Sequence, residues 1–187
     1  MDTTLTDEAR EFRAPLTMTP QELGDNLALL VWESFSDFIS LEDVETPLTD
    51  VATLYDDQGA DSRTAEEALI FFMWAHTRGV QLAFLGRTPD GRIRQGLDAL
   101  HSAVFEDMVD NGTPKSQLPL FEQRVSARYA EYHQAAAQSD GKLGEAVSRH
   151  ILGGIVRETT SAAIRERAVA VANPLKDFLE DVELIEA

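Results

Sequence analysis

Apolar side chains spaced three or four residues apart recur along the chain from residue 19 onward, the spacing expected of one face of an α-helix. The first helix is predicted to begin at Thr19 and Pro20, where a capping hydroxyl is followed by a residue suited to the first helical turn. Its apolar stripe consists of Leu23, Leu27, Leu30, Val31, Phe35 and Phe38. We expect this helix to end near residues 38–40.

The most apolar helix is predicted to begin at Thr64, which forms a second capping-box pattern with Glu67. It continues to Leu85, and Gly86 is well placed as the left-handed residue that ends it. Apolar residues cover most of the circumference of this helix. We therefore expect it to lie at the centre of a helical bundle.

A proline-containing turn at residues 88–91 predicts that the next helix folds back antiparallel to the central one. This third helix carries an apolar stripe over residues 93–108 and should end at Asn111 and Gly112. A fourth apolar stripe covers residues 121–136 and stops at a Ser-Asp-Gly sequence.

A fifth helix is predicted from Leu143, and two glycines, Gly153 and Gly154, interrupt its pattern. Glycine inside a helix costs about 1 kcal/mol relative to alanine. The pair therefore marks either a break in the helix or a close approach to a neighbouring helix. The pattern resumes up to Ala172, and Pro174 is expected to end it and to start a short final helix. No alternating pattern indicates a strand, so we predict an all-α fold, a single-domain antiparallel helical bundle of about six or seven helices.

Two stretches lack a sustained helical pattern. Residues 1–18 have few apolar side chains and are interpreted as a loosely ordered acidic arm. Residues 40–62 carry seven acids, a proline and a glycine, and are interpreted as a long acidic connection that could include a short helix over residues 50–55. The helical domain is thus expected to span residues 19–187.

The chain is strongly acidic, with 33 acidic and 16 basic side chains and a formal net charge of −17. Phosphate groups repel such a protein, so we expect no binding to nucleic acid or to anionic membranes. The basic residues are mostly arginine, with lysine only at Lys115, Lys142 and Lys176. An acidic, lysine-poor surface is typical of proteins that work in high salt, but a GC-rich genome would also favour arginine.

The location of the protein is predicted from what the sequence lacks. The chain has no cysteine, which favours a reducing compartment. The first residues show no secretory signal, and the longest apolar run, Ala68 to Ala75, is far shorter than the roughly 20 residues of a membrane span. We therefore expect a soluble, cytoplasmic protein.

No metal or cofactor is predicted. The four histidines show none of the short spacings that place two imidazoles on one metal. Asp98 and His101 share a helix face, but the second such pair that a di-iron bundle would need is missing. The acidic residues 56–61 do not fit the register of a calcium loop.

A pocket beside the central helix is the best candidate for a site, with Trp74, His76, Arg78 and His101 as its ligand-binding residues. Trp74 and Arg78 are expected on the narrow polar arc of the helix, where arginine can meet an anion and tryptophan offers a flat wall. The alternatives are a buried histidine at position 76 and an arginine that stacks on Trp74 or pairs with an acid from residues 40–62.

No catalytic motif is present, and paired carboxylates such as Glu66 and Glu67 are expected to be exposed, so enzymatic activity is not predicted. The basic residues concentrate in the second half of the chain and the acids at its ends. This separation favours association, either as a homodimer or with a protein partner. The alternatives are a helical-bundle pocket for a small anionic or aromatic ligand and, less favoured, an acidic mimic of nucleic acid.

Overall fold

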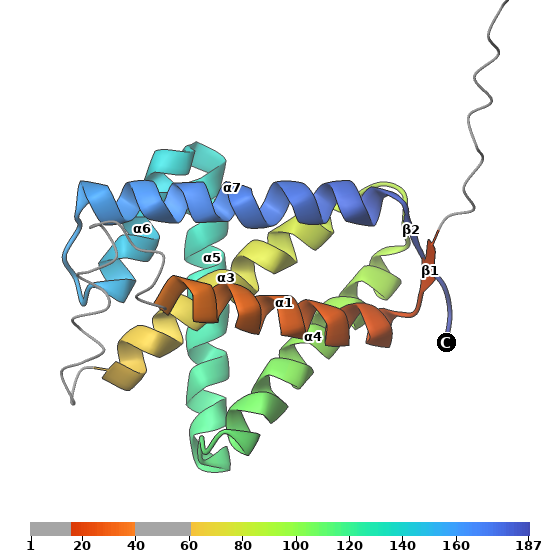
Figure 1. Ribbon diagram of the computed structural model, residues 1–187, viewed down its shortest axis with the longest axis horizontal. Coiled ribbons are helices and arrows are strands. Elements are labelled where there is room, and N and C mark those ends of the chain that lie inside the picture. The colour runs from red at the N-terminus through yellow and green to blue at the C-terminus, as the bar shows by residue number, and fades with distance from the viewer. Residues whose placement is uncertain (1–15, 40–60) are drawn as a thin grey trace, which may run out of the picture.

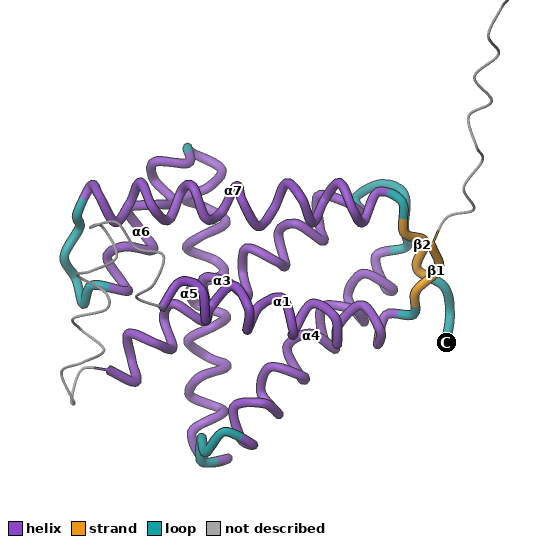
Figure 2. Tube along the Cα trace, viewed as in Figure 1, coloured by secondary structure: helices purple, strands orange, loops and turns teal. Residues whose placement is uncertain are grey.

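The computed structural model of the protein describes residues 16–39 and 61–187, and these form the all-α helical bundle that the sequence predicts. Figures 1 and 2 show the arrangement of the elements. The long helices are α1 (Pro20–Ile39), α3 (Asp61–Phe84), α4 (Asp90–Asp110), α5 (Leu118–Gln138), α6 (Asp140–Ile151) and α7 (Glu158–Glu180). A single turn of 3-10 helix (Lys115–Gln117) precedes α5, and two short strands, β1 (Leu16–Met18) and β2 (Val182–Leu184), complete the described part.

Helix α3 lies at the centre, as its apolar circumference predicts. Every side chain from Ala68 to Ala75 is buried. Helices α1, α6 and α7 all pack against it, with α7 making the most extensive contact. Figure 1 shows α1 and α7 running in opposite directions, and α3 crossing obliquely between these two helices. The core therefore forms around one helix that leaves little of its surface for solvent.

Most of the predicted helix ends agree closely with the structure. At the start of α1 the Thr19 amide donates to Glu22 Oε2 at 2.8 Å, and the Glu22 amide donates to Thr19 Oγ1 at 3.2 Å, which is the expected capping box. The predicted start of α3 at Thr64 is wrong, because the helix begins one turn earlier at Asp61 and the Glu67 carboxylate of the expected capping box binds Arg128 instead. Gly86, with a φ of 77°, follows the end of α3 in the left-handed conformation.

Helix α4 runs back after the predicted turn, but it packs chiefly on α1 rather than on α3. The two helices approach closely at Gly24 of α1, where an added methyl group would collide with Ala99 of α4. Gly96 of α4 lies against Leu23 in the same contact. Because these positions have no side chain, the backbones of α1 and α4 can pack closely together. Helices α3 and α4 are therefore in contact over only part of their length.

The two glycines after α6 form a break, the first of the two alternatives. Gly153 and Gly154 have φ angles of 67° and 106°, in the region that residues other than glycine rarely occupy. Helix α6 ends at Ile151, and α7 begins at Glu158.

The prediction that Pro174 ends a helix is wrong, because α7 continues through it to Glu180. Proline removes one backbone donor, the one that would pair with the carbonyl of Ala170. Both Ala170 and Pro174 are on the exposed side of α7, where water can bind that carbonyl. The residues that follow, Leu175 and Leu179, are buried in the core and favour continuation of the helix.

The expectation that no strand occurs is also wrong. β1 and β2 pair in parallel, with Leu16 opposite Val182 and Met18 opposite Leu184. Three residues are too few to produce a readable alternation. Arg87 stabilises the pair, since its Nη1 donates to the Val182 carbonyl at 2.9 Å.

Part of the predicted acidic arm is thus ordered, because residues 16–18 form β1. Residues 1–15 and 40–60 lie outside the described residues, and so do most of the acidic connection and the short helix suggested within it. None of the helices in the described ranges has the length and apolarity needed to cross a membrane.

Candidate functional site

A cavity of about 710 Å³ lies between α3, α4 and α5. It exists because α4 packs on α1, which keeps much of α4 away from α3, while α5 closes one end. Its apolar lining residues include Leu82, Leu85, Ile93 and Leu97. Its polar lining residues include Thr77, Arg78, Gln81, Asp98, His101 and Tyr129. A cavity of this size and mixed lining is typical of small-molecule sites.

A series of hydrogen bonds among polar lining residues joins α3, α4 and α5 at this cavity. His101 Nδ1 lies 2.5 Å from the Leu97 carbonyl, which can only accept, so Nδ1 carries the proton. In the neutral ring Nε2 is then an acceptor, and it receives the Tyr129 hydroxyl at 2.9 Å. The Thr77 hydroxyl lies 3.5 Å from the Tyr129 oxygen and can donate to it. These hydrogen bonds occupy both nitrogens of His101, so neither is available to act as a general base.

The titratable groups of this network are uncharged near neutral pH. Burial lowers the pKa of His101, an effect that the hydrogen bond to Leu97 and the charge of Asp98 oppose. Burial raises the pKa of the Tyr129 hydroxyl well above its ordinary value. His133, at the cavity edge, also has a lowered pKa, first from burial and then from the charge of Arg78. The charges that line the cavity are therefore two arginines, Arg78 and Arg94, and two aspartates, Asp90 and Asp98.

Arg78 is held over an aromatic ring and has no acidic partner among the described residues. Its guanidinium carbon lies 5.4 Å from the centroid of the Trp74 ring, within the range of a cation–π contact. Trp74 is itself fully buried and packs edge-on against Tyr132 and His133. No carboxylate in the described part of the chain lies within 4.0 Å of Arg78. The stacked arrangement is one of the alternatives that the sequence left open.

The structure separates the four residues predicted to form one pocket. Arg78 and His101 line the cavity together. Trp74 is buried beneath Arg78, so the expectation that it lies on the polar arc is wrong. Trp74 and Arg78 instead share a second, smaller hollow of about 180 Å³ toward α6 and α7. His76 faces the opposite side of α3, between α1 and α7, and its Nδ1 donates to the Phe72 carbonyl at 2.7 Å.

Tyr129, Thr77 and Arg94 belong to the cavity but were not predicted as site residues. Tyr129 had been interpreted only as part of the apolar stripe of its helix. Its partner His101 is 28 residues away in the sequence, and no local pattern connects two residues on separate helices. The packing of α5 across α3 and α4 is what brings them together.

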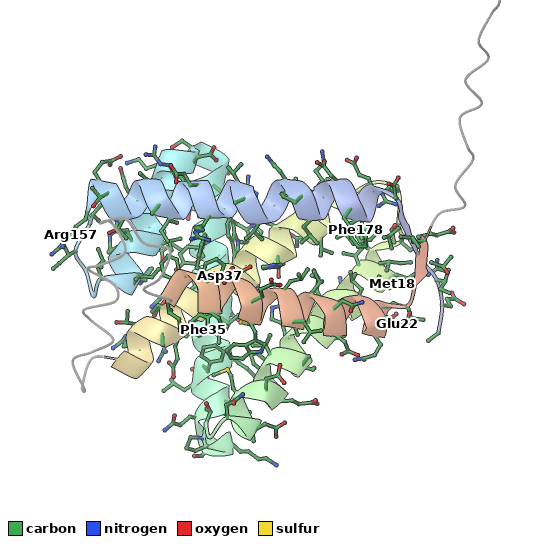
Figure 3. All side chains as sticks on the ribbon, viewed as in Figure 1. Met18, Glu22, Phe35, Asp37, Arg157 and Phe178 are labelled. Atoms are coloured by element: carbon green, nitrogen blue, oxygen red, sulfur yellow. The ribbon has the colours of Figure 1, made fainter. Side chains whose placement is uncertain are left out.

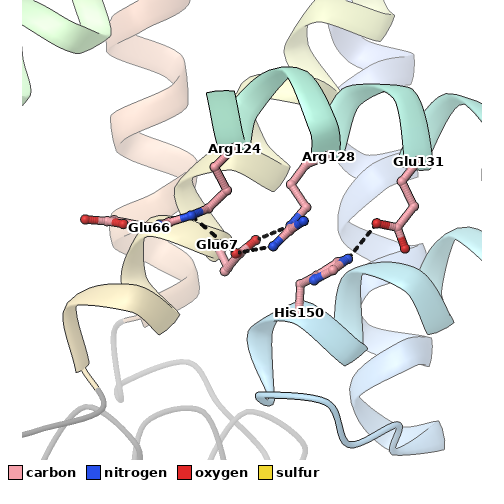
Figure 4. A network of polar contacts seen from close by, with 6 residues as sticks. All are labelled: Glu66, Glu67, Arg124, Arg128, Glu131 and His150. Carbon is pink, nitrogen blue, oxygen red and sulfur yellow. Dashed lines mark hydrogen bonds and ion pairs between the residues drawn. The ribbon is translucent and has the colours of Figure 1, made fainter. Parts of the chain in front are cut away.

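A second polar site lies at the other end of α3, where acids and bases pair with one another (Figure 4). Arg128 donates from Nε and Nη2 to the two carboxylate oxygens of Glu67, each at 2.9 Å. Glu67 is buried, which contradicts the expectation of exposed carboxylates. Next to this pair, Arg124 binds Glu66, and His150 lies 2.6 Å from Glu131. The carboxylates and arginines of this site thus satisfy one another.

Neither site resembles a metal centre. Within the described residues, no three histidine or acidic side chains lie close enough together to hold an ion. Comparison with known proteins gives no further guide, because no family model, no curated protein and no solved structure matches this chain.

Proposed function

We propose that the protein binds a small organic monoanion, with a carboxylate at one end and an apolar body, in the cavity between α3, α4 and α5. The observation that carries this proposal is Arg78, a cation with no acidic partner among the described residues of a chain with a net charge of −17. Arginine binds a carboxylate with two parallel hydrogen bonds, and the stacking of Arg78 on Trp74 holds the guanidinium in place for that contact.

The lining of the cavity supports the rest of the assignment. Leu85 is 76% exposed and Leu82 is 47% exposed, so apolar surface is available for a ligand to cover. The two aspartates of the lining, Asp90 and Asp98, would repel a ligand with several negative charges. A ligand with a single negative charge therefore suits the cavity better than a polyphosphate does. The engagement of both nitrogens of His101 favours binding over catalysis.

A thermal-shift comparison of benzoate with benzamide tests this function. The two probes share shape and ring, but only benzoate carries a charge. We expect benzoate to raise the melting temperature of the full chain and benzamide to leave it almost unchanged. Arg78→Met should remove the benzoate effect, whereas Arg167→Gln, which changes an arginine on α7 outside the cavity, should retain it. Equal shifts with both probes, or with both variants, would contradict the proposal.

A further inference from the structure

A groove lies between α1 and α7, the two helices that run in opposite directions in Figure 1. It consists of two adjoining hollows of about 570 and 270 Å³, and both are lined by Leu30, Leu175 and Phe178. Three large apolar side chains are exposed along it: Leu29 at 69%, Phe178 at 52% and Leu30 at 39%. Figure 3 shows Phe178 on the part of α7 that faces α1. A single exposed leucine is ordinary on a protein surface, but several large apolar side chains along one groove indicate an interaction site.

A nearly buried imidazole forms part of the lining of this groove. His76 lines its smaller hollow and is almost completely buried. Since His76 Nδ1 donates to the Phe72 carbonyl, its Nε2 is the acceptor in the neutral ring. Burial lowers the pKa of His76, which favours that neutral form. No described residue donates to Nε2, and an occupant of the hollow that carries a hydrogen-bond donor could pair with it.

The charges beside the groove are acidic. Helix α1 carries Glu22, Asp25, Glu33 and Asp37 and no basic residue over its whole length. Glu33 lines the groove, and Asp37 lies on the part of α1 that faces α7 (Figure 3). On α7 the nearby Lys176 is already paired with Glu180 at 3.3 Å. A two-fold dimer through this groove would bring the acids of α1 against those of the second copy. A basic segment of a partner protein would pair with them.

We infer that this groove docks an α-helix of a protein partner that carries basic residues beside its apolar stripe. A helix laid between α1 and α7 would bury its apolar residues against Leu29, Leu30 and Phe178, which is the helix-in-groove mode of recognition. Its lysines or arginines would lie near Glu33 and Asp37. The site is separate from the anion cavity, and the two can therefore fail or succeed independently.

Two synthetic peptides test the inference with the full chain. Both are about five helical turns long and present leucines on one face, and they differ only in carrying lysine or glutamate on the flanks. We expect the lysine peptide to bind, measured by fluorescence anisotropy, and its affinity to fall as salt is raised. Phe178→Ser should weaken binding by about tenfold or more. Val169→Ser, which removes an apolar side chain of the same helix that is 47% exposed but outside the groove, should leave it unchanged.

Four results would overturn the inference. Absence of binding, or equal binding of the lysine and glutamate peptides, would remove the basic partner. Equal loss in Phe178→Ser and Val169→Ser would show that the groove is not the site. A dimer in sedimentation analysis that Phe178→Ser dissociates would assign the groove to a second copy of the chain. Arg78→Met should bind the lysine peptide normally, which separates this test from that of the anion cavity.

Discussion

Two arginines lie near opposite ends of α3, Arg128 of α5 and Arg78 of α3 itself, and their electrostatic surroundings differ. Near its start, Glu67 is buried and both of its oxygens accept hydrogen bonds from Arg128. Near its end, Arg78 stacks on Trp74 at a cavity whose aspartates, Asp90 and Asp98, form no ion pair with it. At the first site the carboxylate and the arginine satisfy each other. At the second site no described residue supplies the counter-charge of Arg78, and we propose that a ligand supplies it.

The difference also concerns stability. Removing one member of a buried ion pair leaves the other charged and without water, at a cost of about 3–5 kcal/mol. A partly exposed cation–π contact contributes only about 0.5–1 kcal/mol. The comparison therefore predicts large effects on folding at one end of α3 and small effects on folding, with large effects on binding, at the other.

The largest effect is expected from Glu67→Gln, which leaves the half-buried Arg128 without the buried carboxylate that pairs with it. We expect the free energy of unfolding to fall by about 3 kcal/mol in urea denaturation. Glu145→Gln, at a solvent-exposed pair with Lys142, is the matched control and should change it by less than about 0.5 kcal/mol. The double variant Glu67→Leu with Arg128→Met should recover most of the loss, because apolar side chains of similar size avoid the unpaired charge. A loss below about 1 kcal/mol in Glu67→Gln would break the comparison.

A smaller effect is expected from Tyr129→Phe, in the polar lining of the cavity. The change removes the donor to His101 Nε2 and the acceptor for Thr77. We expect a loss of about 1–2 kcal/mol in the free energy of unfolding, the cost of leaving buried polar groups unpaired. Phe105→Leu, at a nearby ring without a hydrogen bond, serves as the control for packing alone. An unchanged stability in Tyr129→Phe would mean that this series of hydrogen bonds contributes nothing.

Acidification should destabilise the protein through its buried histidines. The pKa values of His76 and His101 are lowered from 6.5, in both cases mainly by burial. Their contribution to stability is therefore complete above pH 6.5 and is lost as the pH falls below that value, since the unfolded chain then binds protons more readily than the folded one. Urea denaturation between pH 7.5 and 5 should show this fall, and His101→Gln should make it less steep. An identical pH dependence in the variant would exclude His101 as a contributor.

The smallest effect on folding is expected from Arg78→Met. The methionine keeps an apolar chain over Trp74 and loses only the cation–π contact, so the free energy of unfolding should change by less than about 1 kcal/mol. Melting curves without ligand measure this. A loss as large as that of Glu67→Gln would show that Arg78 is part of the structural framework rather than a binding group.

Much of the fold could be predicted from the sequence because its signals are local. The capping box at Thr19, the apolar circumference of α3 and the left-handed Gly86 all concern residues within a few positions of one another. The errors at Pro174 and at β1 have a different origin. In both cases distant contacts decide, since Leu175 packs on α3 and Leu16 pairs with Val182 at the other end of the chain.

The candidate site was less predictable for the same reason. Arg78 and His101 were identified from residue type and position, but their common cavity depends on how α4 packs on α1. Trp74 was placed on the polar arc, and Glu67 was expected in solvent. Both are buried because neighbouring helices cover them, Trp74 by Tyr132 and Glu67 by Arg128. The periodic pattern of one helix does not indicate which residues of other helices will pack against it.

The most direct test of the account is a nuclear magnetic resonance titration that follows the arginine Nε–H signals while benzoate is added to the full chain. The account predicts that the signal of Arg78 shifts and saturates, whereas those of Arg124 and Arg128, which are already bound to carboxylates, stay in place. An unchanged Arg78 signal, or equal shifts at all three arginines, would contradict the central claim. That claim is that the arginines at the start of α3 are already paired with carboxylates, whereas Arg78 near its end binds an added anion.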